Sequence, residues 1–171
     1  MASRQKKAIV RSLNGELWWG YLPASGFVSD GIVQLMEVDG RVRSLAVSTI
    51  GSIAYVKDFN LDDPVEPERM GRRSFQTRPR TSGLWIRLGL KNADPLEGLT
   101  EFDLGSLDSI VADGGVTITP PELRGNVVRY FVPRHQLLAM DVLGWVSAGV
   151  KLAKPTSRKL PPEEQPGLFE E

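Results

Sequence analysis

The residues of this sequence best suited to chemistry are five arginines that lie close together. Residues 69–80 contain no acidic residue, and their arginines are Arg69, Arg72, Arg73, Arg78 and Arg80. A guanidinium group can donate two parallel hydrogen bonds to a phosphate or a carboxylate. Phe75 and Trp85 are in or near this segment, and aromatic rings stack on nucleic-acid bases. The five arginines are therefore a candidate polyanion-binding site.

The segment just before the arginines carries the opposite charge. Residues 58–68 contain no basic residue and five acidic ones: Asp58, Asp62, Asp63, Glu66 and Glu68. We expect the arginines to pair mainly with these acids or with the flanking domains, and so to be structural. The formal net charge of zero, from 21 basic and 21 acidic residues, also disfavours general nucleic-acid binding, which usually goes with a basic domain. Nucleic acid is thus an alternative partner and not the favoured one.

The remaining polar residues offer little to an enzyme. There is no Cys and a single His, His135, which excludes thiol catalysis, disulfides, Cys-ligated zinc and multi-histidine metal sites. We expect His135 to be a solvated or capping residue in a turn. Asp103, Asp108 and Asp113 recur every five residues, but calcium loops need denser oxygen ligands. We therefore predict no catalytic residue, no bound metal, no cofactor and no enzymatic activity.

The elements that must position these residues are short alternating apolar segments bounded by turn residues, a pattern typical of an all-β fold. In the first half the predicted strands are residues 8–13, 16–22, 31–37, 41–47 and 52–57. In the second half they are residues 84–90, 96–102, 115–119, 126–132 and 137–143. Asn14-Gly15 and Asp39-Gly40 predict tight turns. Short 3₁₀ turns are expected at residues 48–51 and 133–136.

The order of strands and turns repeats along the chain, with an offset of about 85 residues, which indicates duplicated domains rather than a solenoid. Gly20 and Gly98 fall in the second strand of each half, where we expect a glycine to permit a bend. The adjacent Trp18 and Trp19 must face opposite sides of one strand. The predicted organisation is a first barrel (6–57), a charged linker with prolines (58–81), a second barrel (82–146) and a largely disordered tail (147–171).

Residues 9–22 resemble the first motif of Sm-like proteins: an apolar strand, a tight turn, and then Gly20 followed by an apolar residue. The resemblance implies two tandem five-stranded Sm/SH3-like barrels, and RNA binding as an alternative function. The loop at residues 23–30 lacks the Asn that RNA-binding members carry there. Residues 6–146 also resemble a family of uncharacterised bacterial proteins built from two such repeats, chiefly at residues 75–85 and 131–134.

A second alternative function comes from the spacing of two arginines. Arg69-x-x-x-Arg73 resembles the arginine motif of PilZ domains, which implies a module that responds to cyclic di-GMP. PilZ domains add an Asp/Asn-x-Ser-x-x-Gly element on the barrel, whereas residues 103–106 have a different spacing.

The favoured interpretation is a non-enzymatic binding or scaffolding module with an unidentified protein partner. No stretch approaches the roughly 20 apolar residues that cross a bilayer, and the N-terminal residues lack the apolar core of a signal peptide. We therefore expect a cytoplasmic protein without membrane association. The sequence does not indicate the oligomeric state.

Overall fold

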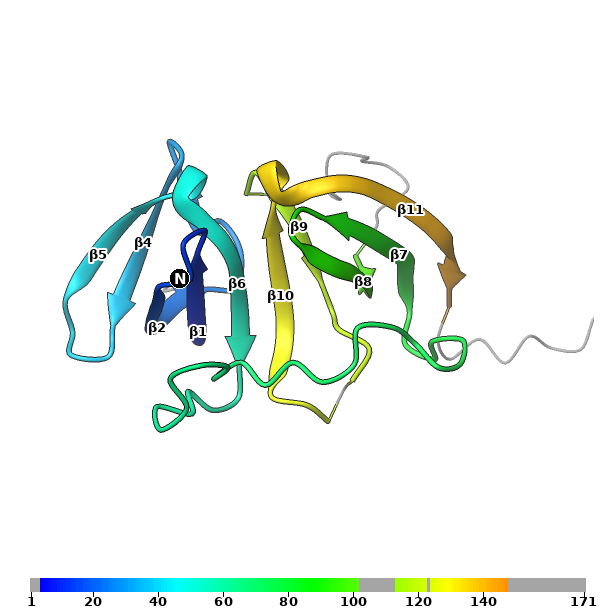
Figure 1. The fold of residues 1–171 in the computed structure, drawn as a ribbon, viewed down its shortest axis with the longest axis horizontal. Coiled ribbons are helices and arrows are strands. Elements are labelled where there is room, and N and C mark those ends of the chain that lie inside the picture. Colours follow the sequence, from blue (N-terminus) through cyan, green and yellow to red (C-terminus); the bar gives the residue numbers. More distant parts are fainter. Residues whose placement is uncertain (1–3, 102–112, 123, 148–171) are drawn as a thin grey trace, which may run out of the picture.

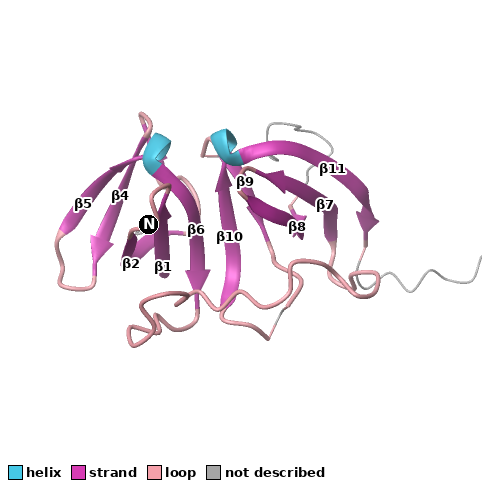
Figure 2. Ribbon diagram, in the orientation of Figure 1, coloured by secondary structure: helices cyan, strands magenta, loops and turns pink. Residues whose placement is uncertain are grey.

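The computed structural model describes residues 4–101, 113–122 and 124–147, and these residues form an all-β protein (Figures 1 and 2). The strands are β1 (Gln5–Ser12), β2 (Leu17–Pro23), β3 (Val28–Ser29), β4 (Ile32–Glu37), β5 (Val42–Ala46), β6 (Ile50–Val56), β7 (Gly83–Leu90), β8 (Ala93–Thr100), β9 (Gly115–Ile118), β10 (Val127–Pro133) and β11 (Leu137–Val146). Two short 3₁₀ helices, η1 (Val47–Thr49) and η3 (Arg134–Gln136), precede β6 and β11. Within the described ranges, no helix has the length and apolar character that crossing a membrane requires.

These elements confirm most of the strands and both short turns expected from the alternating pattern. The strand β3 is an addition that the sequence did not indicate. The two 3₁₀ helices begin at Val47 and Arg134, which are 87 residues apart rather than 85. The predicted tail lies outside the described residues except at its first position, residue 147.

The strands form two sheets. The larger, of eight strands, has the order β3-β4-β2-β1-β6-β10-β9, with β5 paired to the remaining side of β4. The smaller has the order β11-β7-β8. Over the described residues neither sheet closes on itself, so the two closed barrels predicted from the sequence are not seen. The physical reason is that the free side of β6 is taken by β10 from the other half of the chain, which joins the halves into one sheet.

Strand pairing in one half nevertheless has a counterpart in the other. The pairs β1–β2, β1–β6 and β4–β5 correspond to β7–β8, β7–β11 and β9–β10. Ala8 lies opposite Gly20 in the first half, and Ile86 lies opposite Gly98 in the second. A single bridge between Leu99 and Thr119 links β8 to β9, where β2 pairs with β4 in the first half.

The junction of the halves is the antiparallel pair β6–β10, which lies in the middle of the molecule (Figure 1). Ile53 lies opposite Phe131 in this pair, and Phe131 is fully buried in the core of the first half. Its ring meets that of Phe27 edge to face, with centroids 4.9 Å apart. A side chain from the second half therefore completes the core of the first.

Gly20 and Gly98 are positions where another strand approaches too closely for a side chain. A Cβ on Gly20 would lie 2.3 Å from the carbonyl oxygen of Met36, and one on Gly98 would lie 2.6 Å from Cδ1 of Ile118. The expected requirement for glycine is thus explained by close approach of the neighbouring strand. A backbone carbonyl cannot rotate away, whereas a side chain can partly adjust.

We predict that Gly20→Ala destabilises the protein by about 1–3 kcal/mol, as overpacking of a core does, and that Gly98→Ala costs less. The measurement is the free energy of unfolding in urea. Gly144→Ala is the matched control, because nothing lies within 4 Å of a Cβ at that strand position. A Gly20→Ala variant as stable as the Gly144→Ala variant would contradict the pairing of β2 with β4.

Candidate binding site

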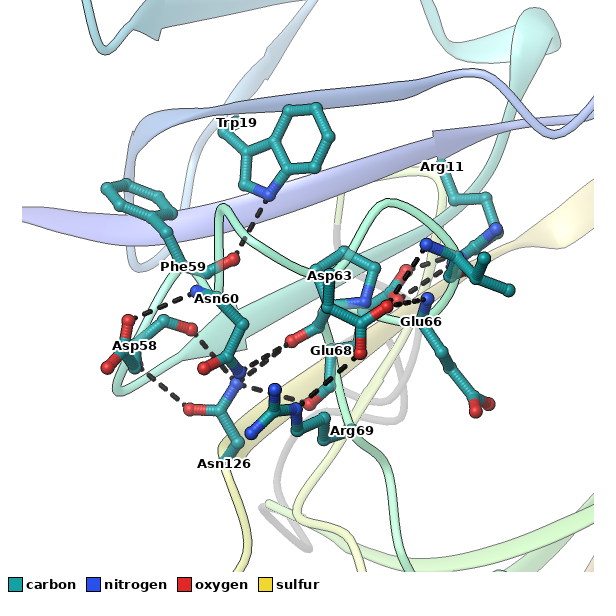
Figure 3. A network of polar contacts seen from close by, with 12 residues as sticks. Arg11, Trp19, Asp58, Phe59, Asn60, Asp63, Glu66, Glu68, Arg69 and Asn126 are labelled. Carbon is teal, nitrogen blue, oxygen red and sulfur yellow. Dashed lines mark hydrogen bonds and ion pairs between the residues drawn. The ribbon is translucent and has the colours of Figure 1, made fainter.

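The linker between the halves lacks helices and strands but is fixed to the fold by a network of polar contacts (Figure 3). Arg11 on β1 forms an ion pair with the buried carboxylate of Glu68, with Nη2 2.8 Å from Oε2 and Nε 3.0 Å from Oε1. The same guanidinium donates to the carbonyl of Val65 at 3.0 Å. The hydrogen bond to Glu68 raises the pKa of Arg11 above its usual value. This pair holds the acidic part of the linker on the first half.

Asn126, just before β10, binds the linker from the second half (Figure 3). Its side-chain amide donates to the carbonyls of Asp58, Pro67 and Glu68 at 2.9, 3.3 and 3.2 Å. Its side-chain carbonyl accepts from the backbone N–H of Asp58 at 2.9 Å. One asparagine therefore closes the loop formed by residues 58–68, and the linker is bound by both halves.

Only one of the five candidate arginines pairs with an acid of the preceding run. Arg69 Nε lies 3.6 Å from Asp63 Oδ2. Backbone N–H groups of Glu66 and Val65 lower the pKa of Asp63, so this acid is held chiefly by the loop's own backbone. Neutralisation of the arginines by the upstream acids is thus seen at a single position among the described residues.

The other four arginines lie elsewhere. Arg73 donates from Nη2 to the carbonyl of Asp94 at 2.7 Å, and Arg78 donates from Nη2 to the carbonyl of Trp145 at 2.9 Å. Arg72 and Arg80 are exposed. Within the described ranges, neither makes a hydrogen bond or an ion pair.

Three of the arginines share one groove. Arg72, Arg78 and Arg80 line it together with the half-buried ring of Phe75, and the floor includes prolines from two segments, Pro79, Pro120 and Pro121. Arg69 and Arg73 lie outside it. Arg73 instead borders a hollow beside Arg11 and Glu68, and its Nε is buried without a partner among the described residues. Arg69 and Arg73, the two arginines with PilZ-like spacing, therefore line different hollows.

The groove is held in place by a buried acid that the sequence did not single out. The Oε2 atom of Glu97 on β8 accepts from the backbone N–H of Phe75 at 3.0 Å and from Trp85 Nε1 at 3.3 Å, and its Oε1 accepts from Arg87 Nη2 at 3.1 Å. The backbone N–H of Glu97 donates to the carbonyl of Arg73 at 2.7 Å. Burial alone would raise the pKa of Glu97, but these donors together hold that pKa below its usual value.

The other polar candidates serve the contact between the halves. His135 Nε2 lies 2.8 Å from the carbonyl oxygen of Ile50, which makes it a donor to the start of β6. The carboxylate of Asp113 accepts from the backbone N–H groups of Gly26 and Val28 at 3.0 and 3.4 Å. Asp103 and Asp108 lie outside the described residues.

The two adjacent tryptophans face opposite sides of β2, as expected. Trp18 packs against the core of the first half, and the guanidinium of Arg43 lies over its ring at 5.8 Å. Trp19 packs against a cluster on the other face that includes Phe59, and its Nε1 donates to the carbonyl of Phe59 at 3.1 Å. Trp19 is therefore in contact with the linker.

A second candidate surface, the outer side of β11, was not predicted from the sequence. The strand β11 pairs with β7 on one side only, and no described residue pairs with its other side. Its exposed apolar side chains are Leu138, Met140, Val142 and Trp145. The available signal was the almost continuous apolar run of residues 137–143, which is typical of strands covered on both faces.

We predict that Glu97→Gln lowers the free energy of unfolding by about 1–3 kcal/mol at neutral pH, since hydrogen bonds to a charged group are lost. A lowered folded-state pKa contributes stability that is present above the unfolded pKa and is lost as pH falls through the folded one. The difference between wild type and variant should therefore shrink in acid. The control is Glu101→Gln, because the Glu101 side chain is 96% exposed and its ion pair should contribute little. Equal effects of the two variants would contradict an anchoring role.

Comparison with known proteins gives a family and no function. No curated protein and no solved structure matches the chain. The expected relationship to an uncharacterised family is confirmed at that level. The chain belongs to DUF6982, a family of unknown function, whose model matches residues 4–144.

Proposed function

We propose that this protein is a non-enzymatic binding or scaffolding module, made of two tandem Sm/SH3-like units, that engages its partner through the open edge of β11. The corresponding strand pairs of the two halves support the tandem units. The observation that carries the binding function is the side of β11, a strand of ten residues, that no described residue covers. An uncovered strand edge offers unpaired backbone N–H and C=O groups to which a partner strand can add.

The side chains of β11 favour a covered edge over a solvated one. Edge strands that stay in water are usually protected by charges, prolines or bulges. In β11 the protection consists of one charged residue, Asp141, and two register shifts in its pairing with β7, at residues 137–139 and 142–144. The apolar residues Leu138, Met140 and Val142 nevertheless occupy exposed positions along it. An exposed apolar patch of this kind marks an interaction site. Binding of a partner that covers β11 is therefore the function that the geometry supports best.

The test is site-specific photo-crosslinking in the cells that make the protein. A benzophenone amino acid at Met140 should form a discrete adduct, because this side chain would lie in the interface. The same label at Leu13, which is exposed but belongs to the first half, is the matched control and should stay unmodified. Absence of any adduct at Met140, or equal adducts at the two positions, would overturn the proposal.

A second candidate function is polyanion binding in the groove of Arg72, Arg78 and Arg80. The favouring observation is that these three arginines share one groove with Phe75. It ranks second because the chain has no net charge and because an acid, Glu122, borders an adjoining hollow that Arg72 also lines.

Binding of single-stranded RNA by this groove should weaken with salt with a log–log slope of about −2, which corresponds to three phosphate contacts. Replacing the three arginines with Ala should abolish it. Arg41→Ala is the control, since Arg41 is exposed in a distant turn and pairs only weakly, with Asp39 at 3.4 Å. No binding at low salt, or binding that survives the triple substitution, would remove this candidate.

A further inference from the structure

The pairing of β6 with β10 shows which strand fits the open edge of β11. In the corresponding strand pairs of the two halves, β11 takes the place of β6 and β5 takes the place of β10. Inside the chain, the outer edge of β6 pairs with the outer edge of β10. The equivalent edges are therefore the outer edge of β11, the counterpart of β6, and the outer edge of β5, the counterpart of β10. Among the described residues, the equivalent edges of β11 and β5 pair with no strand. Figure 1 shows these two strands at opposite ends of the molecule.

Equivalent positions on β6 and β11 differ in exposure as this reasoning requires. Ile53 and Tyr55 on β6 are 0% and 4% exposed and belong to the core that Phe131 of β10 completes. Their counterparts on β11, Met140 and Val142, are 39% and 59% exposed. Met140 lies opposite Leu88, a residue of the second core, so these side chains extend that core to an uncovered end.

We propose that β11 of one copy of this chain pairs antiparallel with β5 of a second copy. This inference rests on the proposed function and names the partner at the same edge. The contact is heterologous, because the surfaces that meet are different, so each added copy again presents one open β5 and one open β11. Repetition of such a contact gives either a closed ring or an open chain of copies.

The junction also predicts the register of the contact. Tyr55, Ala54 and Ile53 lie opposite Arg129, Tyr130 and Phe131 within the chain. The two 3₁₀ helices begin 87 residues apart, and the same offset relates each residue of these strands to its counterpart in the other half. Applied to the junction, this offset places Val142 of one copy opposite Val42 of the next. It likewise places Asp141 opposite Arg43, and Met140 opposite Ser44.

Two of these three pairs are chemically complementary, Val142 with Val42 and Asp141 with Arg43. Val42 is 66% exposed, so its contact with Val142 would cover two apolar side chains that now face solvent. Asp141 lies opposite Arg87 of β7, which pairs with Glu97 instead, and Asp141 makes no hydrogen bond or ion pair with a described residue. Arg43 of the next copy would supply a partner. Arg43 already contacts Glu37, with Nε 2.6 Å from Oε1, and its remaining N–H groups can still bind a second carboxylate.

The test is a pair of charge reversals measured by sedimentation velocity on the full chain. Wild type should associate as its concentration rises. Arg43→Asp and Asp141→Arg, each alone, should weaken association about tenfold or more, since like charges would then face each other across the strands. Mixing the two variants should restore it, because every contact in an alternating assembly again joins opposite charges.

Further variants protect the test against a local folding defect, which circular dichroism would reveal. Val142→Lys should also weaken association, whereas Val65→Lys, at an exposed linker position, should leave it unchanged. A wild type that stays monomeric up to its solubility limit would overturn the inference. So would assembly that ignores the charge reversals, or variants whose mixture does not reassociate. A monomer whose Met140 label captures a different protein would overturn this inference alone and leave the proposed function intact.

Discussion

The antiparallel pairing of β6 with β10 is the contact on which the rest of the structure depends. It satisfies the backbone groups on the open side of β6 and delivers Phe131 into the core of the first half. Ile53, which lies opposite Phe131, is fully buried, whereas its counterpart on β11, Met140, is 39% exposed. The two halves therefore meet in their hydrophobic cores, because Phe131 belongs to the core of the first half and Val127 of β10 clusters with Ile9 and Ala54.

The shape of the linker follows from this junction. Asn126 reaches the carbonyls of residues 58, 67 and 68 because β10 lies beside β6. Arg11 reaches Glu68 from β1, the strand on the other side of β6. Further along, Glu97 on β8 holds the backbone on both sides of residue 74. A segment with few apolar residues is thus positioned by buried or half-buried polar contacts, each of which costs free energy if one partner is removed.

How far the sequence predicts this protein depends on the range of the interactions involved. Strands and turns were predictable because alternation and residues such as Gly15 act over a few neighbours; Gly15 does adopt a positive φ of 90°. The pairing of β6 with β10 was not predictable, since the apolar residues of β10 predict a strand but do not indicate which strand pairs with its edge. The arginine run was similarly ambiguous. Charge counting paired it with the nearest acids, whereas Glu68 is paired with Arg11, 57 residues earlier in the chain, and Arg78 reaches the end of β11.

The outer edges of β5 and β11, at the two ends of the molecule, differ in how well water can solvate their side chains. On β5 the exposed positions carry Val42, Arg43 and Ser44, and two of these three side chains are polar, so water can solvate most of this edge at small cost. On β11 the positions that β10 would cover are occupied by Met140 and Val142, which gain nothing from solvation. Met140 and Val142 are exposed apolar residues whose counterparts on β6 are buried, and an exposed apolar patch marks an interaction site. The pairing of β6 with β10 within one chain is thus the physical precedent for the proposed pairing of β11 with β5 of a second copy.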